Sequence, residues 1–216
     1  MIIQKHIEEL RRDYSGEPLD ESIVERDPLL QFGKWMEDAV RAEVPDPHAM
    51  ALATVSSDGN PSVRMVLLRG FDQSGFVFYT NYNSRKGKEL IDKPVAGGSL
   101  FWHELDRQVR IEGKVEKTSS EESDAYFARR PRKSKIAAWA SNQSNEIKGR
   151  AELDRLFKEF EERFPGEEVP RPGNWGGFRI KPTNYEFWQG RPNRLHDRIL
   201  YTSGNGIKWE IRRLAP

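Results

Sequence analysis

The chain has no cysteine, so disulfide bonds, thiolate metal sites and a cysteine nucleophile are all excluded. The same absence fits a reducing compartment. Neither sign of charge dominates, because 35 lysines and arginines are balanced by 34 acidic residues. A net charge of +1 favours neither nucleic acid nor an acidic membrane as a partner, so any anion has to be bound by a local cluster of cations.

Long apolar runs and the common nucleotide-binding motifs are also missing. The N-terminal stretch "MIIQKHIEELRRDY" is charged throughout, so neither a signal peptide nor a membrane span is expected, and a cytoplasmic protein is the default expectation. No G-x-G-x-x-G or P-loop pattern occurs, which argues against nucleotide binding by those routes. The four histidines lie far apart in the sequence, so no metal site is expected.

Aromatic residues are plentiful, with 11 Phe, 6 Trp and 6 Tyr in 216 residues, which indicates a folded core. Alternating or apolar runs between turn residues predict nine strands. They cover residues 48–57, 62–71, 75–82, 97–104, 107–118, 174–182, 184–190, 198–203 and 207–216. Many short strands interrupted by helices suggest a mainly β fold, a barrel with helical appendages. No linker splits the chain, so we expect a single domain over 1–216 with an N-terminal helical arm (about 1–26).

Helix signals lie on both sides of the strand-rich middle. A weak apolar stripe predicts a helical arm over 1–14, and Asp27-Pro28 supplies an N-cap and a first-turn proline for the next helix. Its expected buried face is Leu29, Phe32, Met36, Ala39 and Val40. Ser119 and Glu122 resemble a capping box, and further helices are expected over 123–130, 133–144 and 150–164.

Three basic clusters could bind an anion, although each also has a plain structural interpretation. In "NSRKGKEL", Asn83 or Ser84 caps a helix whose first turn carries cations, which the helix dipole disfavours unless an anion is bound there. In "YFARRPRKSK", Tyr126 and Arg130 stand one helical turn apart, followed by Ser134, and all three could donate to one phosphate. The apolar strand "RMVLLR" should be buried, so its arginines need a counter-anion or an exit to solvent. A solvated basic surface remains the alternative for each cluster.

A fourth stretch, "FWQGRPNRLHDR" over 187–198, holds three arginines, a histidine and an aspartate after an aromatic pair. It is either a solvated loop between two strands or part of a binding site. Asp197 is expected to hold a neighbouring cation in place rather than to take a proton.

Together these segments resemble the pyridoxine/pyridoxamine 5′-phosphate oxidase family over nearly the whole chain. The most specific pieces are "RMVLLR", "SRKGKEL", "RQVRIEGK", "YFARRPRKS", "NQS", "WGGFRI", "EFWQG" and "RLHDR", in this order. The resemblance implies a homodimeric split β-barrel that binds FMN at the subunit interface.

The resemblance also implies a role for each matching position. The implied FMN-binding residues are Arg64, Met65, Val66, Leu67, Leu68, Arg69, Tyr79, Thr80, Ser84, Arg85, Lys86, Gln108, Gln143, Ser144, Trp188 and Arg198. The implied substrate-binding residues are Arg11, Tyr14, Arg69, Tyr126, Arg130, Ser134, Arg194, Leu195 and His196, of which Arg194 and His196 are the catalytic pair set over the substrate ring. Position 69 is commonly lysine in the family, so a planar fork replaces a point charge at the substrate phosphate.

The implied reaction removes a hydride from C4′ of pyridoxamine or pyridoxine 5′-phosphate and gives pyridoxal 5′-phosphate, with O2 as electron acceptor and H2O2 as product. Two alternatives stay open. One is a related flavin oxidase of another small ring compound of the phenazine type, which the set Tyr126, Arg130 and Ser134 disfavours. The other is a flavin-binding module without turnover, which the intact "RLHDR" disfavours.

Overall fold

The computed structural model describes residue 9, residues 12–203 and residues 208–216. Within these residues the chain forms nine strands, five α-helices of eight or more residues and two short 3-10 helices. The structure divides into two compact units. Unit 1 comprises residues 1–47, 99–111 and 184–216, and unit 2 comprises residues 48–98 and 112–183. Three strands, β5, β6 and β7, contribute residues to both units.

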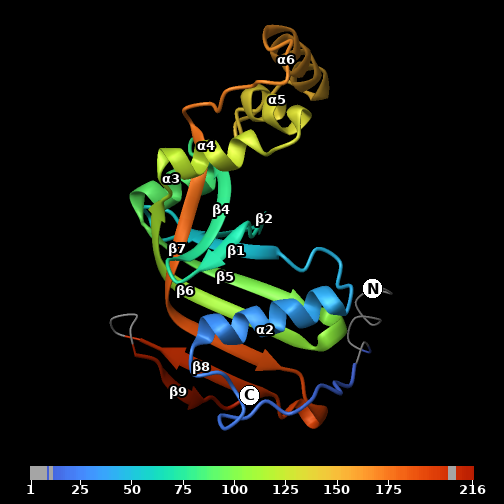
Figure 1. The fold of residues 1–216 in the computed structure, drawn as a ribbon, viewed down its shortest axis with the longest axis vertical. Helices are drawn as coiled ribbons and strands as arrows, with labels where there is room; N and C mark the ends of the chain where they lie inside the picture. The colour runs from blue at the N-terminus through green and yellow to red at the C-terminus, as the bar shows by residue number, and fades with distance from the viewer. Residues whose placement is uncertain (1–8, 10–11, 204–207) are drawn as a thin grey trace. The chain divides into compact units, whose positions relative to one another are not determined.

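Unit 2 is built on a sheet in the order β2-β1-β5-β6-β7-β4-β3, in which the pairs β1–β2, β3–β4 and β4–β7 are antiparallel. Four of these strands lie wholly in unit 2: β1 (Ala49–Val55), β2 (Pro61–Leu67), β3 (Gly70–Asp72) and β4 (Gly75–Asn81). The strands shared by the two units are β5 (Val95–Trp102), β6 (Arg107–Lys117) and β7 (Trp175–Gln189). In Figure 1 the strands of this sheet other than β3 carry labels, and their colours run from cyan through green to orange. The core of the sheet contains Phe78, Phe178 and Ile180, all of which are buried.

The helices of unit 2 are α3 (Arg85–Asp92), α4 (Ser120–Ala128), α5 (Arg132–Ala140) and α6 (Arg150–Arg163). Two of them begin at serine caps: the side chain of Ser84 accepts a hydrogen bond from the backbone N–H of Gly87, and Ser119 accepts one from Glu122. Helices α5 and α6 pack against each other through Trp139 and Phe160, and Figure 1 shows them together in yellow and brown.

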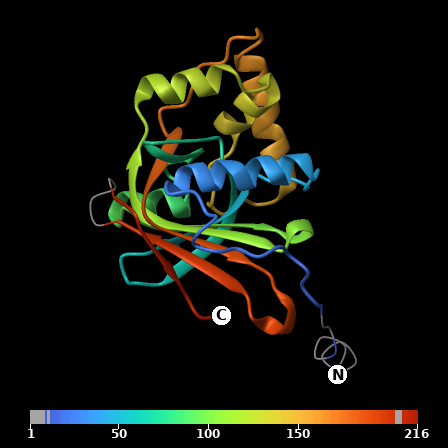
Figure 2. The same cartoon turned by 60° about the horizontal axis from the view of Figure 1, so that its bottom comes forward.

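Unit 1 contains α2 (Pro28–Arg41), the 3-10 helices His103–Leu105 and Pro192–Arg194, and the pair β8 (Asp197–Thr202) and β9 (Glu210–Arg213). Asp27 caps α2, as its side chain accepts a hydrogen bond from the backbone N–H of Leu29. The helix packs on the unit's strands by aromatic contacts, with Phe32 against Trp102 and Trp35 against Phe187. Strands β7 and β8 pair antiparallel, as do β8 and β9, and Figure 2 shows β8 and β9 side by side in red.

Most of the predicted elements are confirmed, and five details are wrong. The run 62–71 is divided into β2 and β3, and the two strands predicted over 174–190 form the single strand β7. Strand β2 is not buried, since Val63 and Met65 are 67% and 63% exposed. On α2, Val40 is exposed, and Trp35 is buried instead. Helix α4 ends at Ala128, because the Arg130-Pro131 step cannot continue a helix.

The N-terminal arm can be compared with the structure only in part, because residues 1–8, 10 and 11 lie outside the described residues. Residues 12–27 contain turns and no helix, so a helical arm does not extend to residue 26. No helix in the part of the chain that the structure describes is long and apolar enough to cross a membrane.

Candidate functional site

A cleft of about 630 Å³ opens in unit 2 between the sheet and the loop that joins α4 to α5. Eleven residues with a predicted role in binding line it: Met65, Val66, Leu67, Arg69, Tyr79, Thr80, Lys86, Tyr126, Arg130, Ser134 and Gln143. They come from β2, β4, α3, α5 and the segments that flank them, so the fold collects residues that are up to 78 positions apart in the sequence.

The cleft is lined by cations and by no carboxylate. Arg69, Lys86, Arg129 and Arg130 all line it, and none of the lining residues is Asp or Glu. Among the described residues, no carboxylate lies within ion-pair distance of these four side chains. Lys86 is buried and Arg130 is half-buried, whereas Arg69 and Arg129 are exposed. A buried or half-buried cation without a counter-charge is costly. The cleft is therefore suited to an anionic ligand.

Lys86 sits in the first turn of α3 and is only 8% exposed. Its Nζ donates to Thr80 Oγ1 and to Gln143 Oε1, each at 3.3 Å, and both acceptors are neutral. Burial, followed by the charge of Arg64, lowers the pKa of Lys86, although Glu89 opposes this shift. The helix can approach the end of β4 this closely because residue 87 is glycine: a Cβ there would lie 2.3 Å from the carbonyl oxygen of Tyr82.

Beside Lys86, the buried carboxylate of Glu89 gathers two of the predicted arginines. Its Oε2 accepts from Arg64 Nη2 at 3.2 Å and from the hydroxyls of Thr54 and Ser62, and its Oε1 accepts from Arg85 Nε at 2.8 Å. Burial raises the pKa of Glu89, but these hydrogen bonds and the charge of Arg64 outweigh it and hold the pKa at about 2. Sequence reasoning did not single out Glu89. Its i,i+4 spacing from Arg85 was the only available signal.

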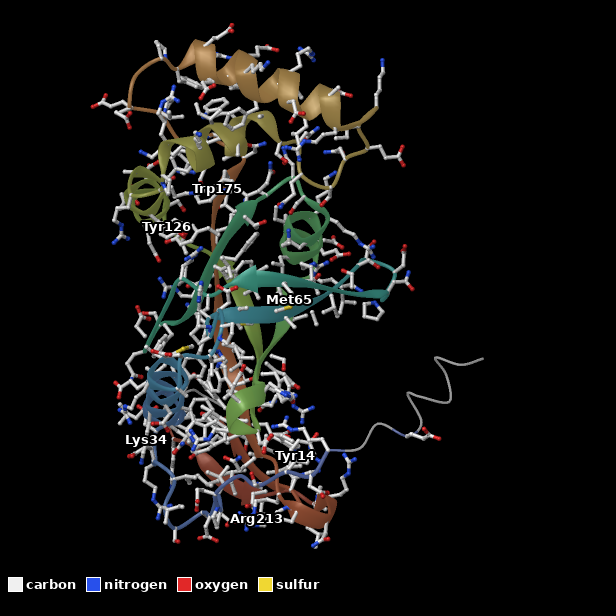
Figure 3. The ribbon with its side chains drawn as sticks, turned by 90° about the vertical axis from the view of Figure 1, so that its right-hand side faces the viewer. Tyr14, Lys34, Met65, Tyr126, Trp175 and Arg213 are labelled. Carbon is white, nitrogen blue, oxygen red and sulfur yellow. The ribbon has the colours of Figure 1, made fainter. Side chains whose placement is uncertain are left out.

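Tyr126 and Arg130 both line the cleft, although they do not lie one turn apart on the same helix as predicted. Tyr126 lies on α4, whereas Arg130 lies in the short break before α5, which carries Ser134. The ring of Tyr126 stacks on that of Tyr79, with centroids 3.8 Å apart and planes 5° apart. The guanidinium of Arg130 lies over the indole of Trp175, its Cζ 4.5 Å from the ring centroid. Figure 3 labels Tyr126 and Trp175, whose side chains lie close together.

Sequence reasoning missed three residues that line the cleft: Arg129, Pro131 and Trp175. Arg129 and Pro131 belong to the basic run that was noted as a whole. Trp175 was expected only as part of the strand 174–182 and of the piece "WGGFRI", without a role in binding, and it does begin β7. No sequence pattern could place its ring beside Arg130, since 45 positions separate the two residues.

A second group of predicted residues lies in unit 1, around the edge of the aromatic ring of Tyr14. Trp188 and His196 contact this ring edge-on, with centroids at 5.6 and 5.1 Å, and Trp188 also contacts His196 at 4.7 Å. The guanidinium Cζ of Arg194 lies 5.7 Å from the Tyr14 centroid. Tyr14, Trp188, Arg194 and His196 are called the aromatic cluster below.

The loop that carries this cluster has unusual backbone geometry. Asn193 and Arg194 both have positive φ angles, 58° and 63°. Left-handed conformations cost about 1–2 kcal/mol per non-glycine residue, and they persist where the surroundings impose them, often at functional sites. Ser144, another predicted residue, also has a positive φ of 72°.

His196 is held in one tautomer, because the backbone N–H of Arg191 donates to its Nδ1 at 3.0 Å. The neutral ring therefore carries its proton on Nε2. Burial and the charge of Arg194 lower the pKa of His196 below its ordinary value of 6.5, although Asp197 opposes this. The side chain is accordingly neutral at neutral pH and can donate one hydrogen bond from Nε2.

The other arginines of this region have carboxylate partners. Arg198 donates to Glu186 Oε1 at 2.8 Å, and Arg110 pairs with the same carboxylate. Asp197 pairs with Arg213 at 2.6 Å and with Arg191 at 3.4 Å, which confirms that it holds neighbouring cations. Among the described residues, no group of three or more His, Asp or Glu side chains is placed to hold a metal ion.

The remaining predicted residues have mixed positions. Arg64, Ser84 and Arg85 lie next to Lys86 and do not line the cleft, and Leu68 is buried. Gln108 is half-buried on β6, and Leu195 is 69% exposed. Arg11 lies outside the described residues.

Two family models together match residues 36–216 of the chain. A family model described as "Pyridoxamine 5′-phosphate oxidase" matches residues 36–188, and one described as "Pyridoxine 5′-phosphate oxidase C-terminal dimerisation region" matches residues 175–216. The chain belongs to the pyridoxamine 5′-phosphate oxidase family. The pyridoxine/pyridoxamine 5′-phosphate oxidase of Nostoc sp. (strain PCC 7120) is 52% identical over 214 residues, 99% of this chain and 100% of that protein.

Solved structures from this family and its relatives confirm the expected fold. The crystal structure of PhzG from Burkholderia lata 383, in complex with tetrahydrophenazine-1-carboxylic acid, has a TM-score of 0.87 at 32% identity, over 94% of this chain and 100% of that one. A pyridoxamine 5′-phosphate oxidase-related, FMN-binding protein from Nostoc punctiforme has a TM-score of 0.71 at 19% identity, over 89% and 100% of the two chains. The expected mainly β split barrel with helical appendages is thereby confirmed.

Proposed function

We propose that this protein is an FMN-dependent oxidase that converts pyridoxamine 5′-phosphate and pyridoxine 5′-phosphate to pyridoxal 5′-phosphate. The observation that carries the proposal is the cleft of unit 2, which four cations and no carboxylate line. A ligand with a phosphate group would supply the missing negative charge, and the family's substrates are phosphate esters.

The residues beside the cleft fit the FMN cofactor. The N-terminus of α3, capped by Ser84, offers free backbone N–H groups, and Lys86 has only neutral acceptors, so both can take up a phosphate. Arg64 and Arg85 stand on the other side of Lys86, fixed by Glu89. When bound, FMN accepts a hydride from substrate carbon C4′.

The chain's own part in the reaction is binding and orientation. Arg69, Tyr126, Arg130 and Ser134 bind the substrate phosphate. Arg194 and His196 act on the substrate ring, where a guanidinium can stack on a pyridine and donate to its phenolate oxygen. For the amine substrate, hydride removal leaves an imine that water hydrolyses to the aldehyde and ammonia, and dioxygen takes the electrons to give hydrogen peroxide.

We further propose that the protein acts as a homodimer. The match to the dimerisation region, 175–216, includes Trp188, Arg194, His196 and Arg198, so these predicted site residues lie in the segment that the family uses for association. Light scattering is expected to give twice the chain mass of 25.0 kDa. A monomer that retains tightly bound FMN would contradict this. A single FMN-binding domain over 1–216 and a cytoplasmic location remain predictions.

Cofactor analysis and turnover test the proposed function together. The purified protein is expected to be yellow, to release one FMN per subunit and no FAD on denaturation, and to consume dioxygen when pyridoxamine 5′-phosphate is added. Hydrogen peroxide should appear in the same amount as pyridoxal 5′-phosphate. A protein that takes up no FMN, or that holds FMN without consuming dioxygen, would refute the proposal.

One relative favours a second candidate, oxidation of a reduced phenazine precursor. The PhzG structure, in complex with tetrahydrophenazine-1-carboxylic acid, is similar to this chain over 94% of its length. A carboxylated tricyclic ring carries no phosphate, so it leaves the set Tyr126, Arg130 and Ser134 without its proposed ligand. Competition between a dihydrophenazine carboxylate and pyridoxamine 5′-phosphate in the same oxygen-uptake assay separates the two candidates.

A further inference from the structure

Trp175 is the largest side chain in the cleft that neither the sequence patterns nor the family resemblance linked to a ligand. It is 7% exposed and begins β7, opposite Asn81 of β4. Its backbone is fixed independently of its side chain: its N–H donates to the Pro172 carbonyl at 3.0 Å, and its own carbonyl accepts from Arg171 Nη1 at 2.7 Å. The indole is thus held at a defined place in the cleft wall.

The indole contacts two of the four residues that we assign to the substrate phosphate. Arg130 lies over it at 4.5 Å, and the ring of Tyr126 lies 6.2 Å away with the two planes 8° apart. Tyr79 completes the set, 5.6 Å from Trp175 and 9° from its plane. The three rings are therefore nearly parallel to one another.

Arg130 depends on this aromatic contact, because no charged partner is present to orient it. Its Nη1 is buried and has no hydrogen-bond partner among the described residues. Burial, together with the charge of Arg69, lowers the pKa of Arg130, although Tyr126 opposes this shift. A planar guanidinium on an indole face keeps its N–H groups pointing outward in that plane, and such contacts are stronger when water is excluded.

We propose that Trp175 is a positioning residue for the substrate phosphate, holding the guanidinium of Arg130 and the ring of Tyr126 in the orientation in which both donate to one phosphate. This rests on the proposed function, since it assigns the cleft to a phosphorylated substrate. Trp175 then determines affinity for the phosphate group and leaves the chemistry at C4′ and the binding of FMN unchanged.

The test compares Trp175→Leu and Trp175→Phe with the wild-type holoenzyme. Leu removes the aromatic face, and Phe restores a smaller one. The control is Trp139→Leu, because Trp139 is a half-buried indole of the same unit, near Arg163 at 5.9 Å, that does not line the cleft. Steady-state kinetics with pyridoxamine 5′-phosphate, inhibition by inorganic phosphate and FMN content are measured for each variant.

Trp175→Leu is expected to raise KM about tenfold, equivalent to about 1.4 kcal/mol, with kcat and FMN content close to wild type. The inhibition constant of inorganic phosphate, which has no ring to bind, should rise by a similar factor. Trp175→Phe should recover part of both losses, and Trp139→Leu should change neither.

A merely structural role predicts a different result, in which kcat, FMN content and thermal stability fall together while the phosphate inhibition constant is unchanged. That result, in Trp175→Phe if the leucine variant does not fold, would overturn the inference. Failure of the wild-type protein to oxidise pyridoxamine 5′-phosphate would refute the proposed function instead, and this is seen before any variant is made.

Discussion

The cations that line the cleft of unit 2 and four arginines of unit 1 differ in their partners. In unit 1, Arg198 and Arg110 share Glu186, and Arg213 and Arg191 share Asp197. In the cleft of unit 2, Arg69, Lys86, Arg129 and Arg130 have no such carboxylate among the described residues. The unit 1 pairs are complete within the chain, whereas the cleft of unit 2 is incomplete without an anion.

The difference separates cations that stabilise the fold from cations that are available to bind a ligand. A cation beside a carboxylate orients backbone and side chains, and removing one partner leaves the other uncompensated. A buried cation without a carboxylate, such as Lys86, destabilises the free protein, and a ligand that brings the opposite charge removes this cost. Arg194 differs from these four arginines of unit 1, since it lies over an aromatic ring and has a left-handed backbone.

Arg194→Ala should have the largest effect. We expect kcat/KM for pyridoxamine 5′-phosphate to fall by roughly 100-fold, about 2.7 kcal/mol of transition-state stabilisation, with FMN still bound. The reason is the loss of the guanidinium that orients the substrate ring. Stopped-flow reduction of the flavin measures this step, and Arg212→Ala, which removes an exposed ion pair with Glu210, is the control. If the flavin of Arg194→Ala is reduced at a rate close to that of the wild type, the result would show that the segment 187–198 is an ordinary surface loop.

Arg130→Ala should have the next largest effect, and on binding alone. Removing a charge-assisted hydrogen bond costs about 2 kcal/mol, so KM for pyridoxamine 5′-phosphate should rise roughly 30-fold while flavin content is unchanged. Because Arg130 has no carboxylate partner, thermal stability should not fall and is expected to rise slightly. Loss of stability comparable to that of an ion-pair variant would show that Arg130 is structural.

Arg85→Ala tests the boundary between the two kinds of cation, because Arg85 pairs with Glu89 and is also predicted to bind the FMN phosphate. Its side chain is 61% exposed, so we expect a loss of FMN affinity near the lower end for charged hydrogen bonds, about 1.5 kcal/mol or roughly tenfold. Fluorescence titration of the apoprotein with FMN measures it. The matched control is Arg155→Ala, which removes an exposed i,i+4 pair with Glu159; equal FMN affinity in both variants would contradict the assignment.

The smallest predicted effect concerns acid stability. The pKa of Glu89 is held at about 2, below its ordinary value of 4.5, so its ionised form stabilises the folded state above pH 4.5. That contribution is lost as the pH falls from 4.5 towards 2. Glu89→Gln should therefore show a flatter fall in unfolding midpoint over this range than the wild type, and Glu159→Gln should not. Parallel curves for Glu89→Gln and the wild type would mean that the four donors do not stabilise the carboxylate.

Local chemistry was predictable from the sequence wherever neighbours along the chain decide the structure. Asp27-Pro28 begins α2, and Ser119 begins α4, because a cap needs only the next few residues. Only one of the two hydrogen bonds of the capping box is formed, since the Glu122 carboxylate pairs with Arg179 instead of accepting from the backbone N–H of Ser119. Long-range partners of this kind have no periodic signal.

The cleft shows the same limit. The resemblance named eleven of its lining residues, because short motifs in a fixed order identify a family. The roles of Trp175 and Glu89 were not predicted, because they depend on contacts with Arg130 and Arg64, which lie 45 and 25 residues away in the sequence. The exposure of Val63 and Met65 on β2 was also missed. An apolar strand sequence predicts that the side chains are buried, but it does not show whether residues of the same chain or of another molecule bury them.

Anaerobic reduction of the flavin tests the central claim. The claim is that the cations of the cleft, which have no carboxylate partner among the described residues, bind the phosphate group of the substrate that the flavin oxidises. Purified holoenzyme is mixed without dioxygen with pyridoxamine 5′-phosphate, and in parallel with the same concentration of pyridoxamine, while the flavin absorbance is followed. The account predicts rapid bleaching by the phosphorylated amine, slow or no bleaching by the other, and return of the colour when air is admitted. Equal bleaching by both amines, or none by either, would contradict it.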